Sequence, residues 1–258
     1  MNRLLRCSVF FFLSVFLPFS LFAQERSDDE AAPLEPFDEI IDVEQADDTA
    51  SPVKDALQRT LTIVMAEQPW NLDIHTATYS SEAQILDSLY EGLFSYDPKT
   101  LEPIPAIAES YKISRDKKRW TFTIRDGATF SDGEKITAYS VRTAWLALLR
   151  TINAPYASML DCVKGAADFR NGKIGESEVG ITARNDKTLV VTLNAPTAHF
   201  AKLLCHHAFA LCKVTESGET DTAVFSGAFT LTENTGASLV LTKNAAYWDA
   251  SHVHVPQI

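Results

Sequence analysis

The chain has 258 residues and carries 34 acidic against 23 basic side chains, a formal net charge of −11 at pH 7. This length suffices for an export signal followed by one good core or two small ones. The acidic balance argues against a nucleic-acid partner, because binding a phosphate backbone needs a concentrated basic face.

The first segment, residues 1–23, has the pattern of a secretory signal peptide. Arg3 and Arg6 form a basic start, residues 7–23 carry no charge, and a small residue precedes Gln24. These are the three parts of an export signal. The apolar run of 17 residues is short for a membrane span, which takes about 20 residues, so we favour cleavage over a retained anchor. Cys7 stands at the start of this run, before its apolar core, whereas a lipid-bearing cysteine follows the signal, so we expect no lipoprotein anchor.

The second segment, residues 24–59, contains twelve acidic and three basic residues and therefore most of the net charge. Pro33, Pro36 and Pro52 interrupt it, and its apolar residues follow no regular period. Such a composition cannot bury enough apolar surface to fold. We predict an acidic disordered linker, with an acidic docking tail as the alternative.

The globular part is expected from Thr60 onward. An apolar run over 61–65 predicts a buried strand. Ser81 and Gln84 have the spacing of a capping box, and apolar residues at helical spacing predict a helix over 82–91.

Further along, the hydrophobic period changes to two. Over 119–125, Trp120, Phe122 and Ile124 share one face, which predicts a half-buried antiparallel strand. A helix capped by Thr137 is expected next. A strand, a short helix and a hairpin are predicted at residues 189–193, 198–204 and 229–241. This mixed order predicts an α/β (mixed α+β) fold class.

Cysteine and histidine residues leave some alternatives open. Three cysteines follow the signal, so at least one thiol is unpaired within the chain; both a Cys205–Cys212 disulfide and buried free thiols are compatible with the spacing. Cys205, His206 and His207 have suitable metal donors. Adjacent histidines on a strand would point in opposite directions, however, so we predict no metal site. No nucleophile elbow, zinc-binding helix or phosphate loop is found, so neither an enzyme nor a cofactor is predicted.

Four blocks stand in a specific order: AESY at 108–111, WTFTIRDG at 120–127, FSDG at 130–133 and TA at 137–138. Together they resemble the signature of extracellular solute-binding protein family 5, the oligopeptide- and dipeptide-binding proteins of ABC importers. Tyr139 and Ser140 depart from the acidic pair usual there, although Ser140 can still support a helix start.

The resemblance implies a periplasmic-binding-protein-like lobe with an inserted small domain, truncated before the second lobe. The first lobe would comprise 60–90 and 181–258, and the inserted small domain 91–180. Family members continue beyond Tyr247 and Trp248 into a second lobe, whereas this chain stops at Ile258.

The implied function is that of a monomeric periplasmic component of a peptide-type ABC importer, with a peptide ligand and membrane permease subunits as partners. Such proteins close two lobes around an extended peptide. The implied ligand contacts are Thr78, Tyr79, Ser80, Tyr156 and Ser226. With one cleft wall absent, we expect weak or no peptide binding by this chain alone. The alternatives are a truncated non-transport interaction protein or remnant, and a nickel or other small-solute binding protein.

Overall fold

The computed structural model describes residues 60–65 and 69–258. The predicted signal peptide and acidic linker lie outside the described residues. Within the described ranges, no helix combines the length and the apolar character that a bilayer span requires.

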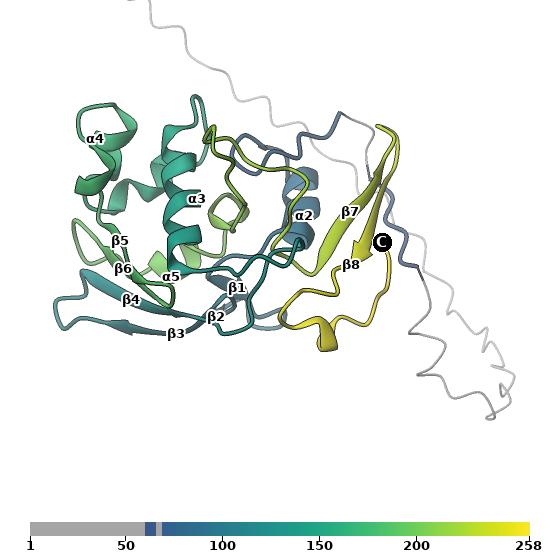
Figure 1. The fold of residues 1–258 in the computed structure, drawn as a ribbon, viewed down its shortest axis with the longest axis horizontal. Helices are drawn as coiled ribbons and strands as arrows, with labels where there is room; N and C mark the ends of the chain where they lie inside the picture. The colour runs from purple at the N-terminus through teal and green to yellow at the C-terminus, as the bar shows by residue number, and fades with distance from the viewer. Residues whose placement is uncertain (1–59, 66–68) are drawn as a thin grey trace, which may run out of the picture. The chain divides into compact units, whose positions relative to one another are not determined.

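A four-stranded antiparallel sheet forms the larger core, in the order β3 (Ala108–Ile113), β4 (Arg119–Ile124), β6 (Thr188–Thr192) and β5 (Ile181–Asn185). Trp120 pairs with Val191 and Phe122 with Leu189 across β4 and β6. The predicted apolar face of β4 is confirmed, because Trp120, Phe122 and Ile124 are all buried. Helix α3 (Ala138–Arg150) packs against β5 and β6 (Figure 1).

Helix α3 begins where the sequence predicts. Thr137 Oγ1 accepts a hydrogen bond from the Ser140 backbone N–H at 3.3 Å, and Ser140 Oγ accepts one from the Thr137 N–H at 3.1 Å. This reciprocal cap satisfies two backbone donors of the first turn. Ser140 therefore supports the helix start, as expected. Farther along α3, buried Trp145 donates its indole N–H to the Phe209 carbonyl at 3.0 Å and so fixes the 207–209 turn.

A smaller core forms where α2 (Ser80–Leu89) packs against the hairpin of β7 (Phe229–Asn234) and β8 (Leu239–Lys243) (Figure 1). The hairpin is confirmed, with Leu231 opposite Leu241. Gly227, just before β7, contacts the last residue of α2, because its N–H donates to the Leu89 carbonyl at 2.8 Å. A Cβ at this position would lie 2.7 Å from Leu89 backbone carbon, so only glycine allows this approach.

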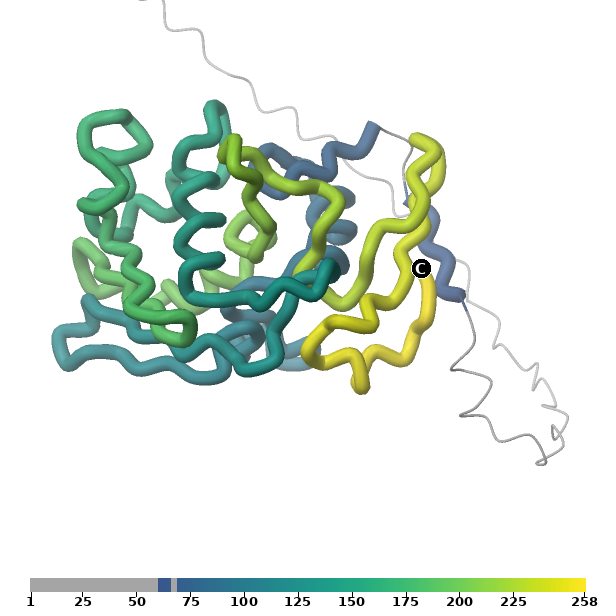
Figure 2. Tube along the Cα trace, in the orientation of Figure 1, coloured from purple at the N-terminus to yellow at the C-terminus, as the bar shows by residue number. Residues whose placement is uncertain are grey.

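The strand predicted over 61–65 is wrong: no strand is assigned there. Leu61 donates one backbone hydrogen bond to Gln257 at 3.0 Å, while Ile258 pairs with Leu241 of β8 (Figure 2). An apolar run becomes a strand only if a neighbour supplies a continuous ladder of partners. Here that ladder is one bond long, and Val64 is 93% exposed.

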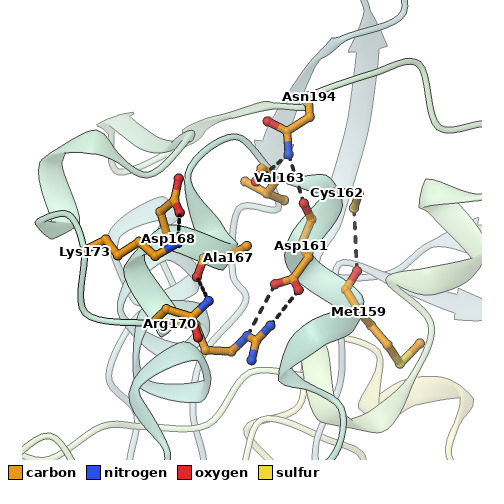
Figure 3. Close-up of polar contacts among 10 residues, drawn as sticks. Met159, Asp161, Cys162, Val163, Ala167, Asp168, Arg170, Lys173 and Asn194 are labelled. Carbon is orange, nitrogen blue, oxygen red and sulfur yellow. Dashed lines mark hydrogen bonds and ion pairs between the residues drawn. The ribbon is translucent and has the colours of Figure 1, made fainter. Parts of the chain in front are cut away.

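The remaining elements are short: β1 (Phe94–Tyr96), β2 (Pro103–Pro105), η1 (Ala157–Cys162), α4 (Ala166–Arg170), η2 (Glu176–Glu178), α5 (Phe200–Leu203), η3 (His207–Phe209) and η4 (Ala250–His252). Figure 3 shows how η1 is held. Asp161 of η1 and Arg170 of α4 point toward each other in a 2.6 Å ion pair, and the Asn194 amide donates to the Asp161 carbonyl at 2.9 Å. These contacts fix the segment that directly follows Tyr156.

The sheet also bears on how the chain is divided. Strands β3 and β4 precede residue 180, whereas β5 and β6 follow it, so one sheet spans the predicted boundary between the inserted domain and the first lobe. All described residues belong to one compact unit. The division into lobe and inserted domain stays a prediction, and the sheet favours a boundary after β6.

Candidate functional site

The N-terminus of α2 is organised by a buried carboxylate. Glu82 is 1% exposed; its Oε1 accepts from the Asn71 N–H at 2.8 Å, and its Oε2 accepts from the N–H groups of Thr78 and Tyr79 at 2.8 and 3.0 Å. Burial alone would raise the pKa of Glu82, but the hydrogen bonds from the Tyr79, Asn71 and Thr78 backbones hold that pKa below its ordinary value. The backbone before α2 is therefore held in place by its hydrogen bonds to the Glu82 carboxylate.

The same feature corrects the predicted helix start. The helix begins at Ser80, two residues earlier than expected, and Glu82 takes the capping role that the sequence pattern gave to Gln84. The side chains of Glu82 and Gln84 can both accept a hydrogen bond near the first turn, so sequence spacing alone did not show which of them caps the helix. Their exposure distinguishes them, because Gln84 is exposed whereas Glu82 is buried.

Tyr156, the residue directly before η1, contacts this fixed segment. Its hydroxyl donates to the Thr78 carbonyl at 3.4 Å. Tyr79, the next residue, is 60% exposed. The structure thus brings together four of the five predicted site residues: Thr78, Tyr79, Ser80 and Tyr156.

Two histidines complete the cluster and were not predicted as part of it. The ring centroid of Tyr156 lies 4.4 Å from that of His206 and 5.4 Å from that of His207. The two imidazoles are 4.3 Å apart, so the expectation that they point in opposite directions is wrong. That expectation assumed a strand, whereas His207 begins the 3₁₀ turn η3. No local pattern relates them to Tyr156, fifty residues earlier, so only the fold reveals the contact.

We call Thr78, Tyr79, Ser80, Tyr156, His206 and His207 the polar wall. Burial lowers the pKa of His207 to about 4, assisted by repulsion from His206, and burial also lowers the pKa of His206. Both imidazoles are therefore neutral at pH 7. The carboxylate oxygens of Glu82, behind the wall, are engaged by backbone donors. The wall consequently offers neutral hydrogen-bonding and ring surfaces on a fixed backbone.

Ser226 does not join the polar wall. It is 1% exposed, donates to the Leu211 carbonyl at 2.5 Å and accepts from the Glu91 N–H at 3.0 Å. It lies beyond the C-terminal end of α2, a helix of 10 residues that at 1.5 Å per residue spans about 15 Å. Its hydroxyl thus has a structural role, which differs from the predicted ligand contact.

The described ranges show the state of three cysteines and the arrangement of possible metal ligands. Cys162, Cys205 and Cys212 are all free thiols, so the Cys205–Cys212 disulfide does not form. Cys212 Sγ lies 3.6 Å from His75 Nε2 in the smaller core. No group of three or more His, Cys, Asp or Glu side chains in this part of the chain is arranged to hold a metal ion.

Comparison with known proteins shows which family this fold belongs to. Residues 102–258 match the family model described as bacterial extracellular solute-binding proteins, family 5 Middle. The chain belongs to this family, and its predicted family and mixed α/β fold class are confirmed.

Individual relatives carry peptide-binding names. The chain is 33% identical over 209 residues to the oligopeptide-binding protein OppA of Bacillus subtilis, covering 77% of this chain and 38% of the relative. It is 31% identical over 224 residues to the periplasmic oligopeptide-binding protein OppA of Salmonella typhimurium, covering 83% and 41%. The peptide-bound OppA structure of Listeria monocytogenes superposes with a TM-score of 0.71 at 28% identity, covering 78% and 42%. The chain thus spans about two-fifths of the length of these relatives.

Proposed function

We propose that the chain supplies one wall of a peptide-binding site and acts as the periplasmic substrate-binding component of a peptide-type ABC importer. The observation that carries this proposal is the polar wall itself, where the Tyr156 hydroxyl bonds the Thr78 carbonyl and Glu82 fixes the adjoining backbone. The peptide-binding names of relatives that share this fold support it.

The proposed wall suits a ligand recognised by its main chain. The N–H groups of Thr78 and Tyr79 are bonded to Glu82 and hold this backbone in place, while each carbonyl oxygen can accept a second hydrogen bond, so an extended peptide can donate to them without an ordering cost in the protein. The rings of Tyr156 and His206 provide flat surface for peptide planes or side chains. Because the wall carries no free charge, it does not select peptides by the sign of their side-chain charge.

Partners and location follow from the same proposal. Relatives are named periplasmic, and one solved relative is an oligopeptide ABC transporter protein of Borrelia burgdorferi, 30% identical with a TM-score of 0.71. We infer that this chain is periplasmic, monomeric and delivers peptide to membrane permease subunits.

A single wall sets the expected affinity. Good small-ligand sites bury at least about 70% of the ligand surface, which one face cannot do. We therefore expect a Kd of about 1 mM or weaker, near −4 kcal/mol.

The test is calorimetry on the 258-residue protein with a mixed pool of short peptides at millimolar concentration. Tyr156→Ala removes the ring and its bond to Thr78 and should weaken binding at least about fivefold. Tyr139→Ala, an exposed tyrosine on α3, is the matched control and should bind like the wild type. Micromolar binding by the wild type, or equal binding by Tyr156→Ala, would contradict the proposal.

A further inference from the structure

The turn between β3 and β4 carries a dense cluster of positive charge, which we call the basic turn. Within residues 112–119, one acid, Asp116, stands among five bases: Lys112, Arg115, Lys117, Lys118 and Arg119. Five bases minus one acid give the turn a charge of +4, within a chain whose net charge is −11. All five bases are exposed, and the turn lies at the left end of the four-stranded sheet in Figure 1.

Asp116 organises the turn rather than pairing with its bases. Its carboxylate accepts hydrogen bonds from the Ser114 hydroxyl at 2.5 Å and from the Lys118 N–H at 3.2 Å. The Ser114 hydroxyl in turn accepts from the Arg119 N–H at 2.9 Å. These bonds fix the backbone of the turn, whereas none of its five cationic groups forms an ion pair with a described residue.

The fold brings a sixth base to the same end of the sheet. Lys164, which follows η1, is exposed and likewise forms no ion pair within the described ranges. Its N–H donates to the Thr192 carbonyl at 2.9 Å, and Thr192 pairs with Arg119 where β6 meets β4. Lys164 therefore borders the basic turn, although no sequence pattern connects the two.

Bases on the neighbouring helices are neutralised by acids. Arg142 and Arg150 of α3 both pair with Glu176, and Arg170 of α4 pairs with Asp161. The basic turn and Lys164 thus form a positive surface that lacks the acidic partners found beside it.

Two apolar side chains are exposed on β3, just before the turn. Tyr111 is 41% and Ile113 is 44% exposed, and their spacing of two places them on one face of the strand. The Tyr111 ring stacks on Trp120 with 5.5 Å between centroids, so one of its faces is already covered. Tyrosine and aliphatic side chains beside bases are typical of surfaces that meet the lipid headgroup region.

We propose that the basic turn and Lys164 dock on the surface of an anionic phospholipid bilayer. An array of lipid phosphates complements six exposed bases, whereas a small free anion is bound well only where a cavity encloses it. At about 0.1 M salt, screening confines charge interactions to about 10 Å, so acids farther from the bilayer oppose docking little. Each base near such a surface strengthens binding about fivefold. This docking does not depend on peptide binding.

The first experiment mixes the 258-residue protein with vesicles of phosphatidylcholine alone, or with about one-third phosphatidylglycerol. Flotation measures binding, and hydrogen exchange read by mass spectrometry locates the contact, because the predicted signal segment is apolar and can bind either lipid. We expect at least about tenfold tighter binding to anionic vesicles and slower exchange at residues 112–119. Equal binding to both vesicles, or unchanged exchange at these residues, would overturn the proposal.

Removing charge from the turn is the second test. Lys117→Gln combined with Lys118→Gln removes two bases and should weaken binding to anionic vesicles about 25-fold. The matched control, Lys99→Gln combined with Lys135→Gln, removes two exposed bases outside the turn and should weaken binding less than about twofold. Equal losses in the two double variants would refute the assignment to the turn.

Salt tests the electrostatic origin of docking. Between about 0.1 and about 1 M sodium chloride the Debye length falls from about 10 to about 3 Å, so binding to anionic vesicles should weaken at least about tenfold. An affinity that salt leaves unchanged would contradict a surface driven by charge.

A nucleic acid is the other polyanion that a basic cluster can bind. Ile113→Ser removes aliphatic surface without changing charge, so it should weaken vesicle binding about threefold and leave binding of a single-stranded oligonucleotide unchanged. Vesicle binding unaffected by Ile113→Ser, or tighter binding of the oligonucleotide than of the anionic vesicles, would overturn the proposal in favour of a nucleic acid.

Discussion

Replacing Glu82 by glutamine tests the part of the structure that positions the polar wall. Three backbone N–H groups bond the two carboxylate oxygens, and a glutamine amide has one oxygen, so at least one N–H loses its acceptor. A hydrogen bond to a charged group contributes about 1.5–3 kcal/mol, and a buried donor left alone costs about 1–3 kcal/mol. The expected loss of unfolding free energy for Glu82→Gln is therefore about 3 kcal/mol.

Urea denaturation followed by circular dichroism measures this loss directly. In a domain of this size 3 kcal/mol corresponds to a fall in Tm of about 6–12 °C. The control Glu109→Gln, at an exposed position of β3, should change the unfolding free energy by less than about 0.5 kcal/mol.

The pH dependence supplies the sharper check. The folded pKa of Glu82 lies below its ordinary value of 4.5, so its stabilising effect is present above pH 4.5 and is lost as the pH falls through the folded pKa. The difference between wild type and Glu82→Gln should shrink in acid. A difference under 0.5 kcal/mol at pH 7, or one that persists undiminished in acid, would refute this role for Glu82.

Two further substitutions test the smaller core. Gly227→Ala should destabilise by at least about 2 kcal/mol, because its Cβ would collide with Leu89 backbone, whereas Gly175→Ala meets open space and should be near neutral; equal effects in urea denaturation would contradict the close packing. Burial lowers the pKa of His75 from 6.5 to about 4, so stability should fall by about 2 kcal/mol as the pH drops from 7 to 5, since the unfolded state then binds the extra proton. The His75→Leu variant should lack this loss of stability in acid. Parallel profiles of unfolding free energy against pH for the wild type and the variant would contradict the assignment to His75.

Elements specified by local residues were predictable from the sequence. The alternation through Trp120, the Thr137 cap of α3 and the hairpin around Leu231 all depend on neighbours within a few positions. The family signature lies in the same segments, which explains why the fold class was readable. The strand predicted over 61–65 was wrong because a strand needs a neighbouring strand as a partner, and the hydrophobicity of a segment does not show whether that partner is present.

The site was only partly predictable for a related reason. Resemblance identified Thr78 to Ser80 and Tyr156, and the structure joins them. It did not anticipate that Ser226 is sealed in by Leu211 and Glu91, since burial depends on the whole chain. His206 and His207 were considered only as metal donors, because their contact with Tyr156 spans fifty residues of sequence.

The central claim, that the polar wall binds peptide, is tested most directly by mapping a peptide on the labelled protein. Unlabelled tri-alanine titrated into the ¹⁵N-labelled 258-residue chain should give its largest amide shifts at residues 78–80, 156 and 206–207, weakened in Tyr156→Ala. Shifts confined to other surfaces, or none at these residues at millimolar peptide, would contradict the account.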